Sequence, residues 1–363
     1  MEKIITNNPT GYPEIRNIFN RYTKEFICKK DLFDLGMRLS HKLTGRGYQP
    51  FWKGLYYNFK DQTTPCIFFN TINLGKNPWT IYFETTLPRL GKTPKAFYDF
   101  AVKQLAKENC KEIIAISQCA YDMQIEYLKQ EYPEYMDVIK PKMKVQLPPQ
   151  EPLIKGYSEK KLPKDKIVFT IVGADFFRKG GKELLQVFDE LIPQNPQLQL
   201  NIVSSMKYGD YATHTTVTDY DNALDIIAKF PNHIKLYNSL PNTEVLDLLK
   251  NTHVGLLPTW ADSFGYSVLE SQATGCPVIT TDIRALPEVN NNDIGWVISV
   301  PKKENGNALI DNQAKKKRFS HILYENLSLT ILDIINNPDS IKLKSINTLN
   351  AIKLRYEVSL PQG

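Results

Sequence analysis

The feature that most constrains the fold is a regular alternation of short apolar segments and amphipathic segments between residues 166 and 298. The apolar runs are typical of strands buried on both faces, and the segments between them have apolar residues at helical spacing. The alternation therefore predicts a parallel sheet covered by helices on both faces. The predicted strands are "KIVFTIVG", "LQLNIVS", "HIKLYN", "HVGLLP", "PVITTD" and "GWVI"; the predicted helices are "KELLQVFDELI", "YDNALDIIAKF", "TEVLDLLKN" with Thr243 as its cap, and "SVLESQATG" ending at Gly275.

The first half of the chain predicts a second, less regular α/β domain. Strands are expected at 65–70, 80–84 and 112–117, and helices at 95–110 and 120–132. Residues 144–166, rich in Pro and Lys, have no helical or strand period and are interpreted as a linker. The predicted domains are 1–150, 151–338 and a C-terminal helix, 339–363, that returns to the first domain.

Charge and cysteine content narrow the class of protein. The five cysteines form no Cys-x-x-Cys pair, which argues against a disulfide framework or a zinc site and fits a reducing cytoplasm. Residues 1–150 hold 22 Lys and Arg against 15 Asp and Glu, so the positive excess of the chain lies there. Nucleic acid, an anionic membrane surface or a phosphate-bearing substrate would each suit such a surface; the alternative is a solvated basic face.

Ligands of open α/β sheets bind beyond the carboxyl ends of the strands, so the loops there are the first place to look. The loop that begins at Gly173 carries Arg178 and Lys179 next to Gly180 and Gly181. Two cations at the start of a helix, whose free N–H groups already favour anions, suggest a site for a diphosphate. The alternative is a helix start with two solvated basic residues.

A second loop, "TWADSFGYSVLES", places Asp262 before a helix and Glu270 one turn inside it. Asp262 is expected at the outer edge of the loop, so that the two carboxylates face one ligand from two sides. Carboxylates suit hydroxyl groups and the helix N–H groups suit phosphate, which together fit a nucleotide sugar. The alternative is a helix with a favourable acid near its start.

The run "PTWADSFGYSVLESQATGCPVITT", with "DIRALPEV" after it, resembles the Pro-x-x-x-E-G-F-G-x-x-x-x-E-A-x-A-x-G-x-P-V motif of retaining GT-B glycosyltransferases of the family 4-like group. The resemblance covers roughly residues 110–300. It implies that Glu270 binds the ribose, that Asp262 binds the donor sugar in place of the usual Glu, and that Lys179 neutralises the leaving diphosphate. Because Ala174 occupies the position of the family's phosphate Arg, Arg178 is expected to supply that charge. The implied donor-binding residues are Gly173, Ser239, Ser263, Phe264, Gly265, Tyr266, Ser267, Val268 and Glu270.

The resemblance implies an α/β GT-B fold with two Rossmann-like domains facing a central cleft. It also implies a metal-independent retaining glycosyltransferase without a cofactor. The donor would be a UDP-, GDP- or similar sugar, and the acceptor a glycan or lipid-linked molecule of bacterial surface polysaccharide synthesis. Glu84 and Arg89 are the expected acceptor-side residues, with a surface ion pair as the alternative. The expected location is the cytoplasm, with peripheral attachment to the inner face of the membrane as a hypothesis.

Three alternatives stay open at this point. A sugar-nucleotide epimerase would share the architecture. A catalytically degenerate GT-B partner subunit would explain the two departures from the motif, Ala174 and Asp262. A nucleic-acid-binding protein would explain the basic first half, although no nucleic-acid module signature accompanies it and it is not the expected partner.

Overall fold

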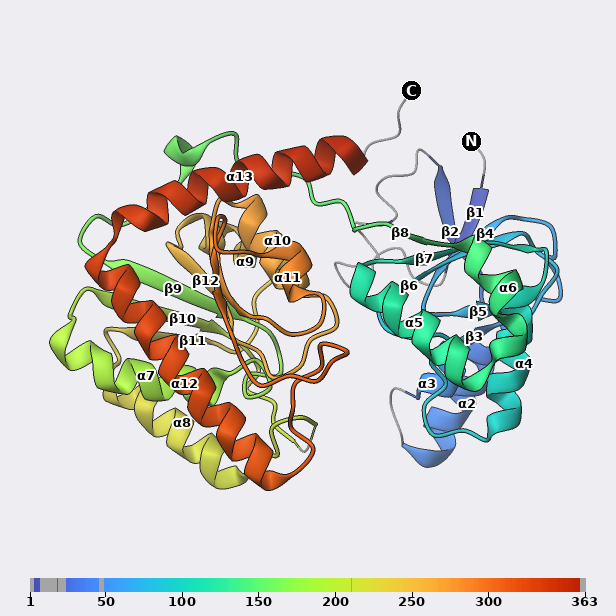
Figure 1. Ribbon diagram of the computed structural model, residues 1–363, viewed down its shortest axis with the longest axis horizontal. Coiled ribbons are helices and arrows are strands. Elements are labelled where there is room, and N and C mark those ends of the chain that lie inside the picture. The colour runs from blue at the N-terminus through green and yellow to red at the C-terminus, as the bar shows by residue number, and fades with distance from the viewer. Residues whose placement is uncertain (1–2, 7–17, 19–23, 46–48, 210, 360–363) are drawn as a thin grey trace. The chain divides into compact units, whose positions relative to one another are not determined.

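The computed structural model describes residues 3–6, 18, 24–45, 49–209 and 211–359 (Figure 1). The chain divides between Pro149 and Gln150 into two compact units, each with its own sheet. We describe each unit by itself. The predicted return of residues 339–363 to the first domain concerns the placement of the units and stays a prediction, and residues 360–363 lie outside the described residues.

The second unit contains a six-stranded sheet in which all neighbouring strands are parallel. Its strands are β9 (Ile167–Val172), β10 (Leu198–Val203), β11 (Ile234–Tyr237), β12 (Val254–Leu257), β13 (Val278–Thr281) and β14 (Trp296–Ile298). Their order, β11-β10-β9-β12-β13-β14, reverses direction between β9 and β12. This reversal is the topological switch point at which open α/β sheets bind ligands.

Two groups of helices pack with this sheet, as the alternation predicts (Figure 1). Helices α7 (Gly181–Leu191), α8 (Val217–Lys229) and α12 (Gln313–Asn336) form one group; α9 (Asn242–Lys250), α10 (Tyr266–Ala273) and α13 (Asp339–Ser359) form the other, and the short α11 (Leu286–Val289) precedes β14. Phe169 of β9 meets Phe188 of α7 edge to face, with ring centroids 5.6 Å apart. Burying two such rings is among the larger contributions to a core, about 1.5–3 kcal/mol for each side chain.

The sequence placed the cap of α9 two residues too late. Thr243 is not its cap: the helix begins at Asn242, Pro241 precedes it, and no side chain caps it. The Asn242 side chain instead donates a hydrogen bond to Glu270 in α10. Asn242, a polar residue at the start of the helix, therefore makes a tertiary contact and does not act as a cap.

The first unit contains a parallel sheet with the order β2-β1-β4-β6-β7-β8. Its strands are β1 (Lys3–Thr6), β2 (Glu25–Cys28), β4 (Cys66–Phe69), β6 (Trp79–Phe83), β7 (Cys110–Ala115) and β8 (Met143–Val145), with a separate pair, β3 (Leu55–Tyr56) and β5 (Ile72–Asn73). The helices are α2 (Leu32–Thr44), α3 (Pro50–Lys53), α4 (Lys95–Ala106), α5 (Gln118–Glu131) and α6 (Met136–Ile139). The predicted linker was too long at its start, because residues 144–145 pair with β7 as part of β8.

Candidate functional site

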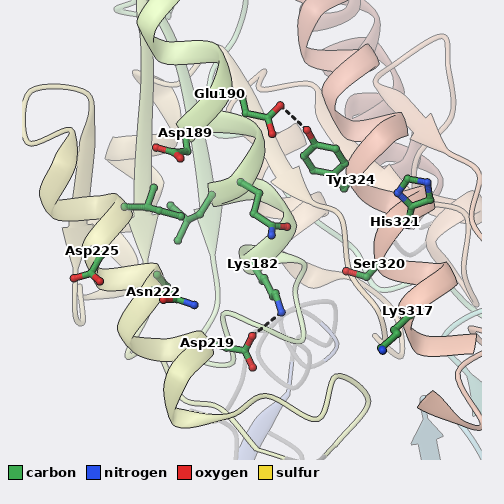
Figure 2. Close-up of a pocket in the computed structure, with 14 residues that line it drawn as sticks. Lys182, Asp189, Glu190, Asp219, Asn222, Asp225, Lys317, Ser320, His321 and Tyr324 are labelled. Atoms are coloured by element: carbon green, nitrogen blue, oxygen red, sulfur yellow. Dashed lines mark hydrogen bonds and ion pairs between the residues drawn. The ribbon is translucent and has the colours of Figure 1, made fainter. Parts of the chain in front are cut away.

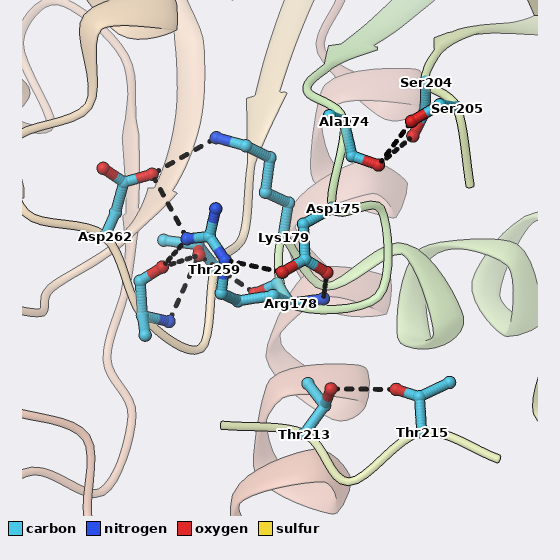
Figure 3. Close-up of polar contacts among 11 residues, drawn as sticks. Ala174, Asp175, Arg178, Lys179, Ser204, Ser205, Thr213, Thr215, Thr259 and Asp262 are labelled. Atoms are coloured by element: carbon cyan, nitrogen blue, oxygen red, sulfur yellow. Dashed lines mark hydrogen bonds and ion pairs between the residues drawn. The ribbon is translucent and has the colours of Figure 1, made fainter. Parts of the chain in front are cut away.

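The two loops that follow β9 and β12 are joined to each other at the switch point (Figure 3). The carbonyl oxygen of Arg178 accepts hydrogen bonds from the backbone N–H of Trp260, at 2.9 Å, and from the Thr259 hydroxyl, at 3.0 Å. Thr281, at the end of β13, donates to the Thr259 carbonyl at 2.8 Å. The ends of three strands thus fix the loops that carry the predicted site residues.

Lys179 and Asp262 form an ion pair between these loops (Figure 3). The Lys179 Nζ lies 3.2 Å from Asp262 Oδ2, and only 12% and 14% of the two side chains are exposed. The expectation that Asp262 lies at the outer edge of its loop was therefore wrong. Its other oxygen accepts hydrogen bonds from the backbone N–H groups of Phe264, at 3.3 Å, and Gly265, at 3.1 Å, which turns the carboxylate inward.

The charges around Asp262 determine its ionisation. Burial alone would raise the pKa of this carboxyl, but the charges of Lys179 and Arg178 and the hydrogen bonds outweigh burial and hold the pKa below its ordinary value of 3.8. Asp262 is therefore an anion at neutral pH. A carboxylate in this state accepts hydrogen bonds and cannot donate a proton to a leaving group.

This lowered pKa predicts a pH-dependent contribution to stability. For a carboxyl with a lowered folded-state pKa, the stabilisation is fully present above the ordinary value of 3.8 and is lost as the pH falls through the folded-state pKa. We expect Asp262→Asn to lower the free energy of unfolding at pH 7, and the difference from the wild type to shrink toward pH 3. Denaturant titrations across this range measure it, with the exposed Asp247→Asn as the control. A difference that does not change with pH would contradict the ion pair.

Arg178 is held by contacts on both sides. Its backbone N–H and its Nε donate to the two oxygens of Asp175, at 3.3 and 3.0 Å, and its Nη1 donates to the Ala261 carbonyl. The same Nη1 lies 3.9 Å from Asp262 Oδ2. The guanidinium therefore stays beside the Lys179–Asp262 pair. Asp175, which the sequence did not suggest, is the residue that positions it.

Two glycines make room for this arrangement. A Cβ atom on Gly180, where φ is +82°, would lie 2.0 Å from the Pro258 carbonyl oxygen. A Cβ atom on Gly173 would lie 2.2 Å from Cε of Lys179, so the lysine side chain passes directly over this glycine. The first glycine lets the loops meet and the second leaves space for the lysine.

Gly173→Ala is therefore expected to displace the Lys179 ammonium without removing it. We expect a lower free energy of unfolding, because the alanine methyl group and the lysine side chain cannot occupy the same space. Denaturant titrations measure this. Gly209→Ala is the matched control, since a Cβ atom there meets nothing within 4 Å. Equal stabilities of the two variants would contradict the close contact between Gly173 and Lys179.

Glu270 lies in α10, the helix that follows the loop carrying Asp262. It is the fifth residue of α10 and 8% exposed, and its Oε1 accepts a hydrogen bond from Asn242 Nδ2 at 2.9 Å. The helix begins after Gly265, whose φ is +90°, and the Ser267 hydroxyl in its first turn is buried with no hydrogen-bond partner among the described residues. An unsatisfied hydroxyl at a helix N-terminus is a ready donor for an oxyanion.

The other predicted donor-binding residues differ in how deeply they are buried. Phe264 and Val268 are buried, and the Phe264 ring packs 5.0 Å from that of Tyr266, so their side chains are structural and only backbone groups remain for a ligand. Ser263 lies in the loop itself. Ser239 lies between β11 and α9, in the segment that leads to Asn242.

Sequence analysis also missed a buried carboxyl, that of Glu183, which is hydrogen-bonded to the loop that carries Asp262. Glu183, in the first turn of α7, is 1% exposed; it accepts hydrogen bonds from Trp260 Nε1 at 3.3 Å and from the Ser320 hydroxyl of α12 at 2.5 Å. Burial raises the pKa of this carboxyl. It connects α7, α12 and the loop that carries Asp262. The sequence indicated only that Glu183 lies near the start of a predicted helix, where an exposed acidic residue would be equally common.

A pocket of about 920 Å³ lies elsewhere in the second unit, along α7, α8 and α12 (Figure 2). Several of its charged side chains already contact each other or nearby residues: Lys182 pairs with Asp219 at 2.6 Å, and the Tyr324 hydroxyl donates to Glu190 at 2.5 Å. None of the predicted site residues lines it. Despite its size, it has no feature that identifies a ligand, so the functional argument rests on the loops at the switch point.

In the first unit, the two predicted acceptor-side residues are paired with each other. Arg89 Nη1 contacts Glu84 Oε1, and Asn70 Nδ2 lies 3.3 Å from the same oxygen. Asn70 and Glu84 directly follow β4 and β6, neighbouring strands of the sheet, so the three residues form a polar cluster at its carboxyl edge. Whether they contact an acceptor stays a prediction.

In the part of the chain that the structure describes, no group of three or more His, Cys, Asp or Glu side chains could hold a metal ion. No helix among the described residues is both long and apolar enough to cross a membrane.

Residues 157–328 match the protein family described as glycosyl transferases group 1. One relative is the D-inositol 3-phosphate glycosyltransferase of Thermobifida fusca, 26% identical over 38% of this chain and 32% of that protein. Another is the capsular polysaccharide biosynthesis glycosyltransferase CapM of Staphylococcus aureus, 26% identical over 38% of this chain and 34% of that protein. The matches thus span about a third of these relatives' length.

Solved structures resemble the whole chain. WaaG, a glycosyltransferase involved in lipopolysaccharide biosynthesis, has a TM-score of 0.56 at 12% identity, covering 100% of both chains. HepE of Anabaena, in complex with UDP, has a TM-score of 0.57 at 12% identity, covering 98% of this chain and 96% of that one. Likeness at this identity shows the fold, and it confirms the predicted GT-B class of two Rossmann-like units.

Proposed function

We infer that this chain, which belongs to the glycosyl transferases group 1 family through residues 157–328, transfers a sugar from a nucleoside diphosphate to an acceptor with retention of configuration. The observation that carries the proposal is the meeting of Lys179, Arg178 and Asp262 at the switch point of the second sheet. Cations fixed in loops at this position suit a diphosphate, and a fixed carboxylate beside them suits sugar hydroxyls.

The difficult event in such a reaction is the separation of charge as the diphosphate leaves the anomeric carbon. Lys179 would stabilise that charge, and in doing so would exchange part of its contact with Asp262 for one with a phosphate oxygen. Arg178, held by Asp175, would contribute a second positive charge without reorganising. Preorganised charge of this kind lowers a barrier because the groups are already oriented before the bond breaks.

Glu270 and the start of α10 would bind the other parts of the donor. With its Oε1 held by Asn242, the Glu270 carboxylate would accept a hydrogen bond from a ribose hydroxyl. The Ser267 hydroxyl and the first N–H groups of α10 would donate to the phosphates. In the relatives, UDP is named in the HepE complex and capsular polysaccharide in the name of CapM. We propose a glycan or lipid-linked acceptor of surface polysaccharide synthesis.

A screen of UDP-, GDP- and other nucleoside-diphosphate sugars by thermal shift, followed by assays of donor hydrolysis and transfer, tests this proposal. A sugar nucleotide that binds the native state raises the unfolding temperature, and at equal concentration it does so more the more tightly it binds. We expect one nucleotide class to stabilise the chain and to release its nucleoside diphosphate. Binding without turnover would favour the degenerate-partner alternative, and interconversion of two sugar nucleotides would favour the epimerase.

A further inference from the structure

Helix α2 of the first unit has two apolar faces, of which one packs against other described residues and the other is exposed. The packed face carries Phe33, whose ring lies 6.1 Å from that of Phe51 and 6.2 Å from that of Trp52. A Cβ atom on Gly36 would lie 2.2 Å from the Trp52 ring, so the helix is in close contact with α3 along this side. Asp31 caps the helix start and Gly45, with φ at +66°, ends it.

The other face carries a stripe of exposed leucines. Leu32, Leu35, Leu39 and Leu43 have exposed fractions from 54% to 75%. At about 100° of rotation per residue, all four fall within an arc of about 80°, which makes a continuous apolar strip along the helix. Phe59, 66% exposed, extends the strip, because the backbone N–H of Leu32 is bonded to the carbonyl of Tyr57, two residues away.

Cations border this strip. Arg38 and Lys42 lie on the same side of it, and both are exposed. Lys30 and Lys60 lie near its N-terminal end, where the Asn58 side chain donates to the Lys30 carbonyl at 3.5 Å. The acid of the helix, Asp34, lies on the far side from the leucines and is 3.9 Å from Lys53. The border of the strip is therefore positive.

We propose that the outward face of α2, with Phe59 at its end, binds the surface of an anionic lipid membrane. Leucines on one line with lysine and arginine beside them are what an interfacial helix needs: the apolar side chains enter the acyl boundary and the cations meet the lipid phosphates. A second copy of the chain is a poorer occupant, because a two-fold interface would bring the same cations together. The proposal does not depend on the donor site, and its failure would leave the proposed transferase intact.

Flotation of the full chain with vesicles of phosphatidylcholine and phosphatidylglycerol tests this. We expect the wild type to float with these vesicles at low salt, to bind vesicles of phosphatidylcholine alone much more weakly, and to dissociate as salt screens the cations. The variant Leu35→Gln/Leu39→Gln/Leu43→Gln should lower the partition coefficient at least about tenfold, because three buried side chains are lost. The matched control, Leu329→Gln/Leu343→Gln/Leu354→Gln, changes equally exposed leucines of the second unit and should bind as the wild type does.

Arg38→Gln/Lys42→Gln keeps the leucines and removes two cations, so it tests the proposal even if the leucine variant does not fold. It should weaken binding to anionic vesicles and reduce its dependence on salt. Circular dichroism checks the fold of each variant. The proposal is overturned if the wild type does not float, if either α2 variant floats as the wild type does, or if sedimentation shows a dimer that the leucine variant dissociates.

Discussion

Lys179→Ala is expected to lower kcat by about 10²- to 10³-fold, the cost of losing one preorganised donor to a developing negative charge. The ammonium is already held near the site, with Nζ 3.2 Å from Asp262 and its stem over Gly173, so the substitution removes a charge that is oriented before the bond breaks. The acceptor KM should change much less, because Lys179 belongs to the donor side. Steady-state kinetics with both substrates varied separate these two effects.

Lys182→Ala is the matched control for this variant. Lys182 lies three residues further on, in α7, and pairs with Asp219 in a contact that is partly exposed. Its replacement should leave kcat near that of the wild type and change stability little, as expected for an exposed ion pair. If Lys179→Ala and Lys182→Ala had the same kcat, the leaving-group role of Lys179 would be wrong.

Glu270→Ala is expected to weaken binding of the nucleoside diphosphate by about 10- to 100-fold. Hydrogen bonds to a charged group contribute about 1.5–3 kcal/mol each. The Glu270 carboxylate is only 8% exposed, so water competes little for its hydrogen bonds. Calorimetry with UDP and with GDP measures the dissociation constants directly, and no acceptor is needed.

Two further variants separate the charge of Glu270 from its orientation. Glu270→Gln keeps the shape and one acceptor oxygen, so it should lie between the wild type and the alanine variant. Asn242→Ala leaves the carboxylate in place but removes the hydrogen bond that orients it, and should have a smaller effect than Glu270→Ala. Nucleotide affinity unchanged in Glu270→Ala would contradict the ribose-binding role.

The architecture of the second unit was predictable because its physical signals are local. Buried parallel strands are continuous apolar runs, and the helices between them have one apolar face, so all six strands were found from β9 to β14. The first unit was harder, because β1, β2 and β8 are only three or four residues long and β3 and β5 only two. Strands this short do not establish a period.

The site was predictable in its members but not in its contacts. Lys179, Arg178, Asp262 and Glu270 could be named because they follow strand ends and match a motif. Their pairing depends on residues 83 positions apart in the chain, as for Lys179 and Asp262, and no local pattern encodes such a distance. The same holds for Asn242 beside Glu270 and for Glu183 behind Trp260. Each supports the site through the tertiary fold, where a sequence shows only an ordinary polar residue.

At the switch point, the structure shows two loops joined by hydrogen bonds and an ion pair. The proposed function requires a nucleotide sugar to bind at these loops. A crystal structure of the chain with the nucleoside diphosphate that stabilises it most tests this directly. The account predicts the diphosphate at the carboxyl ends of β9 and β12, with a phosphate oxygen within hydrogen-bond distance of Lys179 Nζ and the ribose on Glu270. A nucleotide bound elsewhere, such as in the pocket along α7, α8 and α12, or a Glu270 turned away from the ribose, would contradict it.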